Sequence, residues 1–169
     1  MDPMIKASGE RYFIGLRKNT TLEDEVPGSL WRAFMPRRRE VKDALTSQYY
    51  AIQLYPDLQS FTPQCLFEKW AAVEVPSRNS SVPAGMALLT VPPGTYALFI
   101  HKGTPNGFSK TLHDILHHWL PLSDYTLEVR PHMEVMDDHY NPRDPEAEEE
   151  VWIPVRLRVS LSDARKTTQ

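Results

Sequence analysis

Short apolar runs, most of them ended by proline or glycine, dominate the first half of the chain. Residues 11–16, 49–55 and 67–75 each combine aromatic and apolar side chains and predict three strands. Between the first two runs, apolar side chains recur at helical spacing over residues 30–45. Pro36 is expected to kink or break that helix at the preceding residue. The first half is therefore predicted to run strand, helix, strand, strand.

The second half repeats this order. Residues 86–91 and 96–101 predict strands, the first closed by two prolines and the second by a Lys-Gly pair. Residues 108–119 carry an apolar face at helical period and predict a helix that the next proline stops. Two further strands are predicted at 133–136 and 150–157, with an acidic loop between them.

Two pairs of segments echo one another across the halves. Residues 12–16 resemble 96–100, and the Glu-Lys-Trp at 68–70 has a counterpart in the Glu-Val-Trp at 150–152. We therefore predict an α+β domain of duplicated strand–helix–strand–strand units. The units are expected to be related by pseudo-twofold symmetry, with a ligand groove between the halves.

Length, charge and hydropathy narrow the class of protein. The chain has 169 residues, 41% of them apolar, which is enough for one continuous core. Its net charge of −3 argues against a general nucleic-acid binder, so no direct nucleic-acid partner is expected. Without a secretory signal or a membrane-length apolar run, a cytoplasmic protein with no membrane contact is predicted. We assign residues 1–10 to an N-terminal extension, 11–159 to the domain and 160–169 to a flexible tail.

The closing strand carries the sharpest candidate for a binding residue, Glu150. Side chains two apart share one face of a strand, so Glu150 and Trp152 point one way while Val151 and Ile153 point the other. The apolar pair marks the core face, which leaves the carboxylate and the indole facing the groove. Together they suit a cation, through charge and a cation–π contact of roughly 0.5–2 kcal/mol. The alternative is that Glu150 merely ends a solvated acidic run.

Three further aromatic residues are candidate ligand contacts. Trp70 shares a strand face with Glu68 and either lines the groove or packs in the core. Trp31 lies at the edge of the first helix's apolar stripe, where a ring covers either a groove or the sheet. Tyr50 belongs to an aromatic-rich run near one mouth of the groove. The sequence leaves these alternatives open.

Two histidines of the second helix have the spacing of a metal-binding pair. His113 and His117 are four residues apart, with Asp114 between them, and such a pair can hold one metal ion. Both are expected to project away from the apolar face, and the sequence offers no clear third ligand. We therefore predict neither a metal site nor a cofactor.

Four stretches, in register and covering nearly the whole chain, resemble the GyrI-like family, which includes the effector-binding domains of AraC-type and MerR-type regulators. The stretches are Leu-Trp-Arg-Ala-Phe at 30–34, Pro-Gly-Thr-Tyr-Ala-Leu-Phe-Ile-His-Lys-Gly at 93–103, Trp-Leu-Pro-Leu-Ser-Asp-Tyr at 119–125 and Glu-Val-Trp-Ile-Pro-Val at 150–155. Trp70 and Trp152 stand where the family commonly has tyrosine, so each position stays aromatic.

This resemblance implies a domain that binds flat hydrophobic compounds, with a glutamate meeting their positive charge. The expected partner is a hydrophobic or cationic small molecule. The residues expected to hold it are Glu150, Trp152, Trp70, Trp31 and Tyr50. In multidomain regulators the domain is fused to a helix-turn-helix, and the short flanks of this chain predict a stand-alone member.

Two other functions share the resemblance. Some stand-alone members hydrolyse strained cyclopropane rings in DNA-alkylating natural products, and there Glu150 would position water against the electrophilic carbon. Another bacterial member inhibits DNA gyrase by contact, which makes gyrase or a separate regulator a candidate partner. Binding and hydrolysis need the same residues, so the sequence leaves open whether the protein is an enzyme.

Overall fold

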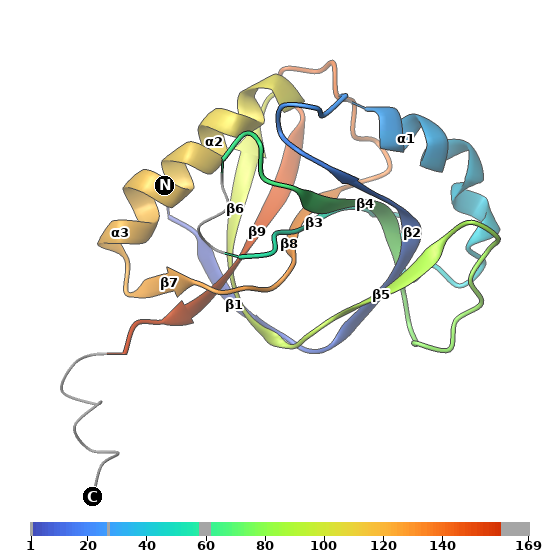
Figure 1. Cartoon of the computed structure of the whole chain (residues 1–169), viewed down its shortest axis with the longest axis horizontal. Coiled ribbons are helices and arrows are strands. Elements are labelled where there is room, and N and C mark those ends of the chain that lie inside the picture. The colour runs from blue at the N-terminus through green and yellow to red at the C-terminus, as the bar shows by residue number, and fades with distance from the viewer. Residues whose placement is uncertain (1, 27, 58–61, 160–169) are drawn as a thin grey trace, which may run out of the picture.

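A curved antiparallel sheet runs through the computed structural model, which describes residues 2–26, 28–57 and 62–159 (Figure 1). Its strands are β1 (Met4–Ser8), β2 (Arg11–Thr20), β3 (Tyr49–Leu54), β4 (Phe67–Val75), β5 (Ala87–Val91), β6 (Gly94–Lys102), β7 (Tyr125–Leu127), β8 (His132–Met136) and β9 (Glu148–Leu157). Their order across the sheet is β1-β6-β9-β8-β3-β4-β2-β5, and β7 pairs with the end of β9.

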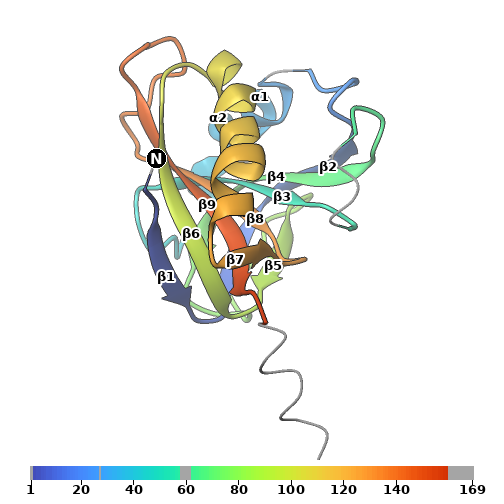
Figure 2. The ribbon, with the colours of Figure 1, turned by 90° about the vertical axis from the view of Figure 1, so that its left-hand side faces the viewer.

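Two helical segments cover one face of this sheet, one over each half (Figures 1 and 2). The first consists of α1 (Ser29–Phe34) and the 3₁₀-helix η1 (Met35–Glu40), and the second of the 3₁₀-helix η2 (Pro105–Gly107), α2 (Phe108–Asp114), the π-helix η3 (Ile115–Trp119) and α3 (Leu120–Leu122). Strands and helices together confirm the predicted α+β class. No helix among the described residues has the length and apolar character needed to cross a bilayer.

The first helix is shorter than its apolar pattern predicted. Proline has no N–H and crowds the preceding turn, and the α-helix ends at Phe34, two residues before Pro36. The chain continues as the 3₁₀-helix to Glu40 and leaves the helix there. Leu45, which the pattern placed on the helix face, is instead exposed.

The N-terminal extension contributes a strand that the sequence pattern did not predict. Residues Met4–Ser8 pair with β6 as an edge strand, and four of the five are exposed, so no apolar alternation marks them. Edge strands bury little surface and give weak periodic signals. The tail predicted at 160–169 lies outside the described residues.

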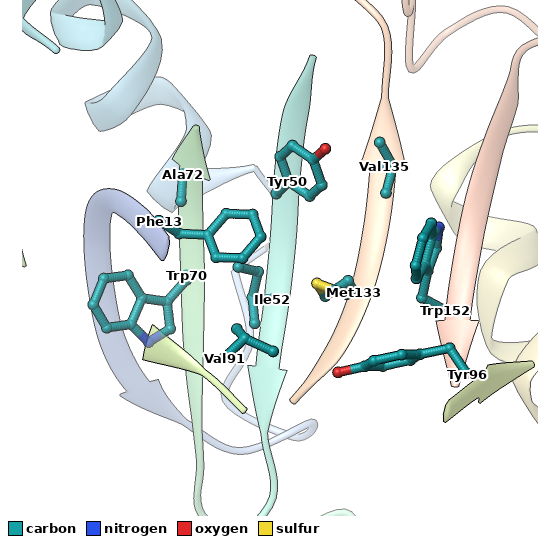
Figure 3. Close-up of a cluster of buried hydrophobic side chains, with 10 residues drawn as sticks. All are labelled: Phe13, Tyr50, Ile52, Trp70, Ala72, Val91, Tyr96, Met133, Val135 and Trp152. Atoms are coloured by element: carbon teal, nitrogen blue, oxygen red, sulfur yellow. The ribbon is translucent and has the colours of Figure 1, made fainter. Parts of the chain in front are cut away.

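Three apolar clusters divide the core between the two faces of the sheet. Under α1 lie Ile14, Phe34 and Val73 with their neighbours, and under α2 lie Phe99, Ile115 and Ile153 with theirs. The opposite face, enclosed by the curl of the sheet, holds the third, which we call the inner cluster (Figure 3). Its members are Phe13, Tyr50, Ile52, Trp70, Ala72, Val91, Tyr96, Met133, Val135 and Trp152.

The two halves meet where β3 pairs with β8. On one side the strand order is β3-β4-β2-β5, and on the other it is β8-β9-β6-β1. The two halves exchange their edge strands. β1 comes just before β2 in the chain but pairs with β6 in the other half, and β5 comes just before β6 but pairs with β2. Superposition of the halves about a pseudo-twofold axis stays a prediction.

Candidate functional site

A cavity of about 480 Å³ borders the inner cluster. One wall is the segment from Lys6 to Arg11, which leads from β1 into β2. The other wall comes from β3, β4, β8 and β9, and includes Tyr50, Glu150 and Trp152. Figure 3 shows Tyr50 and Trp152 on either side of the strand that carries Val135. Segments far apart in sequence therefore meet at this cavity.

Alternation along β9 places the acidic and aromatic groups on the cavity side. Val151 and Ile153 are buried in the cluster under α2, so Glu150 and Trp152 face the opposite way. The indole Nε1 of Trp152 donates a hydrogen bond of 2.9 Å to Glu150 Oε2. In the described part of the chain Glu150 makes no ion pair.

Arg11 occupies the space between the aromatic rings beside the cavity. Its guanidinium carbon lies 5.3 Å from the ring centres of Phe13 and Tyr50. The centre of the Trp152 ring is 5.2 Å away. Such distances are those of cation–π contacts. Arg11 therefore covers part of the aromatic surface beside the cavity.

A carboxylate holds Arg11 in that position. Both oxygens of Glu74 accept hydrogen bonds of 2.8 Å from the guanidinium, and the Tyr50 hydroxyl accepts another at 3.1 Å. Burial lowers the pKa of Arg11, but the bonds to Glu74 outweigh it and the pKa is raised. Burial also raises the pKa of Tyr50 to about 12, which keeps its hydroxyl protonated. The Arg11–Glu74 pair is thus a fixed, neutral unit of the wall.

Lys6 is the second cation at the cavity. Its Nζ lies 5.0 Å from the centre of the Trp152 ring, and the side chain belongs to an exposed edge strand. Unlike Arg11, it makes no ion pair with any residue that the structure describes. A flexible, exposed lysine is easily displaced, so this contact closes the cavity only loosely.

A family model decides what kind of domain this is. The model of the GyrI-like small molecule binding domain matches residues 1–156. The chain belongs to the GyrI-like family. Transcriptional regulator BrlR from Pseudomonas aeruginosa is 27% identical over 154 residues, which cover 90% of this GyrI-like chain and 53% of BrlR. The chain therefore spans about half the length of this curated relative.

Solved structures share the GyrI-like fold. SAV2435 bound to tetraphenylphosphonium superposes with a TM-score of 0.66 at 15% identity, over 92% of this chain and 94% of that one. The C-terminal domain of EcmrR gives a TM-score of 0.65 at 16% identity, over 93% of this chain and 98% of the other. At such identities the likeness shows a common fold.

Three of the five residues predicted to bind ligand meet at the cavity. They are Tyr50, Glu150 and Trp152. Trp70 belongs to the inner cluster but not to the cavity wall. Its Nε1 donates to Glu68 at 2.6 Å, as Trp152 does to Glu150.

The fifth, Trp31, lies behind the sheet. It packs against Phe34 and Tyr49 in the cluster under α1, on the face opposite the cavity. The alternative in which its ring covers the sheet is therefore the one the structure has. Helix periodicity puts Trp31 at the edge of the apolar stripe, but it does not determine which face of the sheet the helix covers.

Sequence reasoning did not select Arg11, Glu74 or Lys6. Glu74 shares its strand face with Trp70 by alternation, so the residue could have been found from the pattern. Arg11 likewise shares a face of β2 with Phe13. Lys6 carried no signal, because β1 has no apolar alternation.

Two carboxylates lie behind the sheet from this cavity. Glu134 and Glu149 alternate along their strands with the cavity-lining Val135 and Glu150, and so face the helix side. Gln53 Nε2 donates to Glu134 at 2.5 Å. Desolvation raises the pKa of Glu134, and burial followed by repulsion from Glu134 raises that of Glu149.

Proposed function

We propose that this GyrI-like domain binds hydrophobic, often cationic aromatic small molecules in the cavity between β1 and β9. The observation that carries the proposal is the Glu150 carboxylate, which lines the cavity beside the Trp152 indole without an ion pair in the described part of the chain. A cation entering the cavity would gain both the charge and the ring.

The size of the cavity suits such a ligand. Ligand pockets commonly enclose about 300–1,000 Å³. The volume of about 480 Å³ falls within that range. Glu74 neutralises Arg11 and Arg78 neutralises Glu10, so among the described residues the charges at the cavity without an ion pair are Glu150 and Lys6. A cationic ligand would replace the Lys6 ammonium over the Trp152 ring.

Likeness to a ligand-bound structure supports the same chemistry. SAV2435, which shares the fold, was solved with tetraphenylphosphonium, a cation surrounded by four phenyl rings. The family model describes a small-molecule-binding domain. Neither names the ligand of this chain, and tetraphenylphosphonium is used below as a probe.

Matched dyes test the proposal. Glu150→Gln keeps the shape of the side chain but removes its charge, so affinity for a cationic dye should fall about 5- to 50-fold while a neutral dye of the same shape is little affected. Lys6→Gln removes a competing cation and should raise affinity for the cationic dye roughly 2- to 5-fold. Fluorescence titration measures both.

Lys42→Gln, an exposed lysine away from the cavity, is the matched control for Lys6 and should leave both dyes unchanged. Equal losses for the two dyes in Glu150→Gln would remove the carboxylate from the binding site. An unchanged affinity in Lys6→Gln would mean that the ligand does not approach the face of Trp152 that Lys6 covers.

The hydrolase and gyrase-inhibitor functions stay predictions. Incubating the protein with a cyclopropane-bearing alkylating compound and analysing for the ring-opened product tests the first. A pull-down with gyrase subunits tests the second. Neither experiment measures ligand affinity, so only the dye titrations test the binding proposal.

A further inference from the structure

The helix over the second half of the sheet changes its period part-way along. α2 ends at Asp114, and Ile115–Trp119 form a π-helix, in which backbone hydrogen bonds join residues five apart. In an α-helix of 3.6 residues per turn, residues five apart point about 140° away from each other. The wider π turn brings them onto one face. Single π turns of this kind occur frequently at functional sites.

This change of period gathers three metal-ligating side chains. His118 Nδ1 lies 3.2 Å from Asp114 Oδ1, and His113 Nδ1 lies 3.9 Å from the same oxygen. Ligand atoms of the three residues all lie within 4.8 Å of one another. The spacing of His113 and His117 had suggested an i,i+4 pair without a third ligand. The π turn brings His118 near His113, five residues before it, while Asp114 and His118 are i,i+4 neighbours.

The distances are close to those of a bound metal ion. Ligand bonds of about 2.0–2.1 Å in a tetrahedral zinc site put neighbouring ligand atoms about 3.3 Å apart. Asp114 and His118 already have about this separation, 3.2 Å, in the hydrogen bond that joins their side chains. The side chain of His113 is 61% exposed, which leaves it room to move toward Asp114 Oδ1 and shorten the longer distance.

A neighbouring lysine orients the carboxylate. Lys110 Nζ lies 2.9 Å from Asp114 Oδ2, which leaves Oδ1 directed at the two imidazoles. Outer-shell contacts of this kind fix the orientation of a ligating group and are a regular part of metal sites.

We propose that His113, Asp114 and His118 form a surface binding site for a divalent transition metal of the zinc class. Two imidazole nitrogens and one carboxylate oxygen suit Zn²⁺, Cu²⁺ or Ni²⁺ better than Mg²⁺ or Ca²⁺, which prefer oxygen ligands alone. Three protein ligands leave one tetrahedral position for water. The site lies on the helix side of the sheet, opposite the aromatic cavity.

A cavity lies next to the site, on the side where the metal's fourth coordination position could hold water. Asp114 and His118 line a space of about 520 Å³ together with Trp119, Leu122 and Ser123. The indole of Trp119 is held by ring contacts to Phe99 and Tyr125, 5.1 Å and 6.3 Å between centres. A metal-bound water or small anion would therefore meet a fixed aromatic wall on one side.

Zinc titration of the full chain tests this site. After removal of bound metal with a chelator, ZnCl₂ is added in competition with a chromophoric zinc indicator. We expect one zinc ion per chain, and at least tenfold weaker binding in Asp114→Asn and in His118→Gln. The side chains are exposed or half-buried, so circular dichroism should show unchanged folding in both variants.

Two further variants serve as matched controls. His139 lies beside Asp138, with 3.6 Å between Nε2 and Oδ1, in a histidine–aspartate pair outside the trio, and His139→Gln should leave zinc affinity unchanged. The His117 ring is 4.4 Å from that of His113, so His117→Gln separates an i,i+4 pair from the π-turn trio. The absence of saturable binding would overturn the proposal. So would losses in His117→Gln or His139→Gln as large as those in His118→Gln.

Discussion

Single side chains decide how much of the inner aromatic surface is open to a ligand. Arg11 lies against three rings and is held by Glu74, so that part of the cluster is occupied permanently. Lys6 lies against Trp152 alone and is exposed. The difference follows from desolvation: a largely buried cation needs a carboxylate partner, whereas an exposed one does not. The proposed ligand therefore competes with Lys6 rather than with Arg11.

At the same scale, the Glu134 carboxyl group on the helix side of the sheet predicts how stability varies with pH. Desolvation raises the pKa of Glu134 to about 7 in the folded protein, against an unfolded value of 4.5. The folded state then holds its proton more tightly, so stability falls as pH rises from the unfolded pKa to the folded one.

Glu134→Gln cannot ionise and still accepts the hydrogen bond from Gln53. It should match the native chain near pH 4.5 and become more stable than it toward pH 8, by about 1.4 kcal/mol for each unit of pKa shift removed. Urea unfolding at several pH values measures this difference. Glu23→Gln, an exposed control, should show no such trend. If the free energy of unfolding changed with pH in the same way for Glu134→Gln and the native chain, folding would not raise the pKa of Glu134.

Among the elements, β2 is the strand whose packing depends most on one small residue. A Cβ added to Gly15 would lie 2.0 Å from the carbonyl oxygen of Ala71 and 2.7 Å from Cα of Ala72, both backbone atoms of β4. Backbone cannot move aside as a flexible side chain can. The close approach of β2 and β4 in this curved sheet is therefore possible only with glycine.

Gly15→Ala should destabilise the protein by about 1–3 kcal/mol or more, because β2 and β4 must separate to accept the methyl group. Gly9→Ala provides the control, because a Cβ there meets nothing within 4 Å. Denaturant unfolding of the two variants gives the comparison. If both variants were as stable as the native chain, the close contact between β2 and β4 would not exist.

The sequence pattern predicted most elements, and its failures share physical causes. Strands β2, β3, β4, β6 and β9 are largely buried, and their apolar runs marked them. The edge strand β1 buries almost nothing and left no pattern. The π-helix was missed because an apolar stripe was fitted to the α-helical period, so the position of His118 relative to His113 was not foreseen.

In the whole molecule, alternation identified the strand face that borders the cavity but not all of the residues around it. It placed Glu150 and Trp152 opposite the core residues Val151 and Ile153, and the structure has them there. Alternation did not predict the contact between Arg11 and Trp152, because the curvature of the sheet brings the start of β2 close to β9. Long-range contacts of this kind depend on sheet curvature, which periodicity does not encode.

The central claim is that ligands bind on the inner face of the sheet, beside Glu150. A crystal structure of the chain with tetraphenylphosphonium tests it most directly. The phosphonium should lie in the cavity with a phenyl ring against Trp152, its charge within about 6 Å of that indole and next to the Glu150 carboxylate, and the Lys6 side chain should have moved away. Ligand density on the helix side of the sheet, under the helices or near Glu134, would contradict the account. In that case Lys6 would still lie over Trp152.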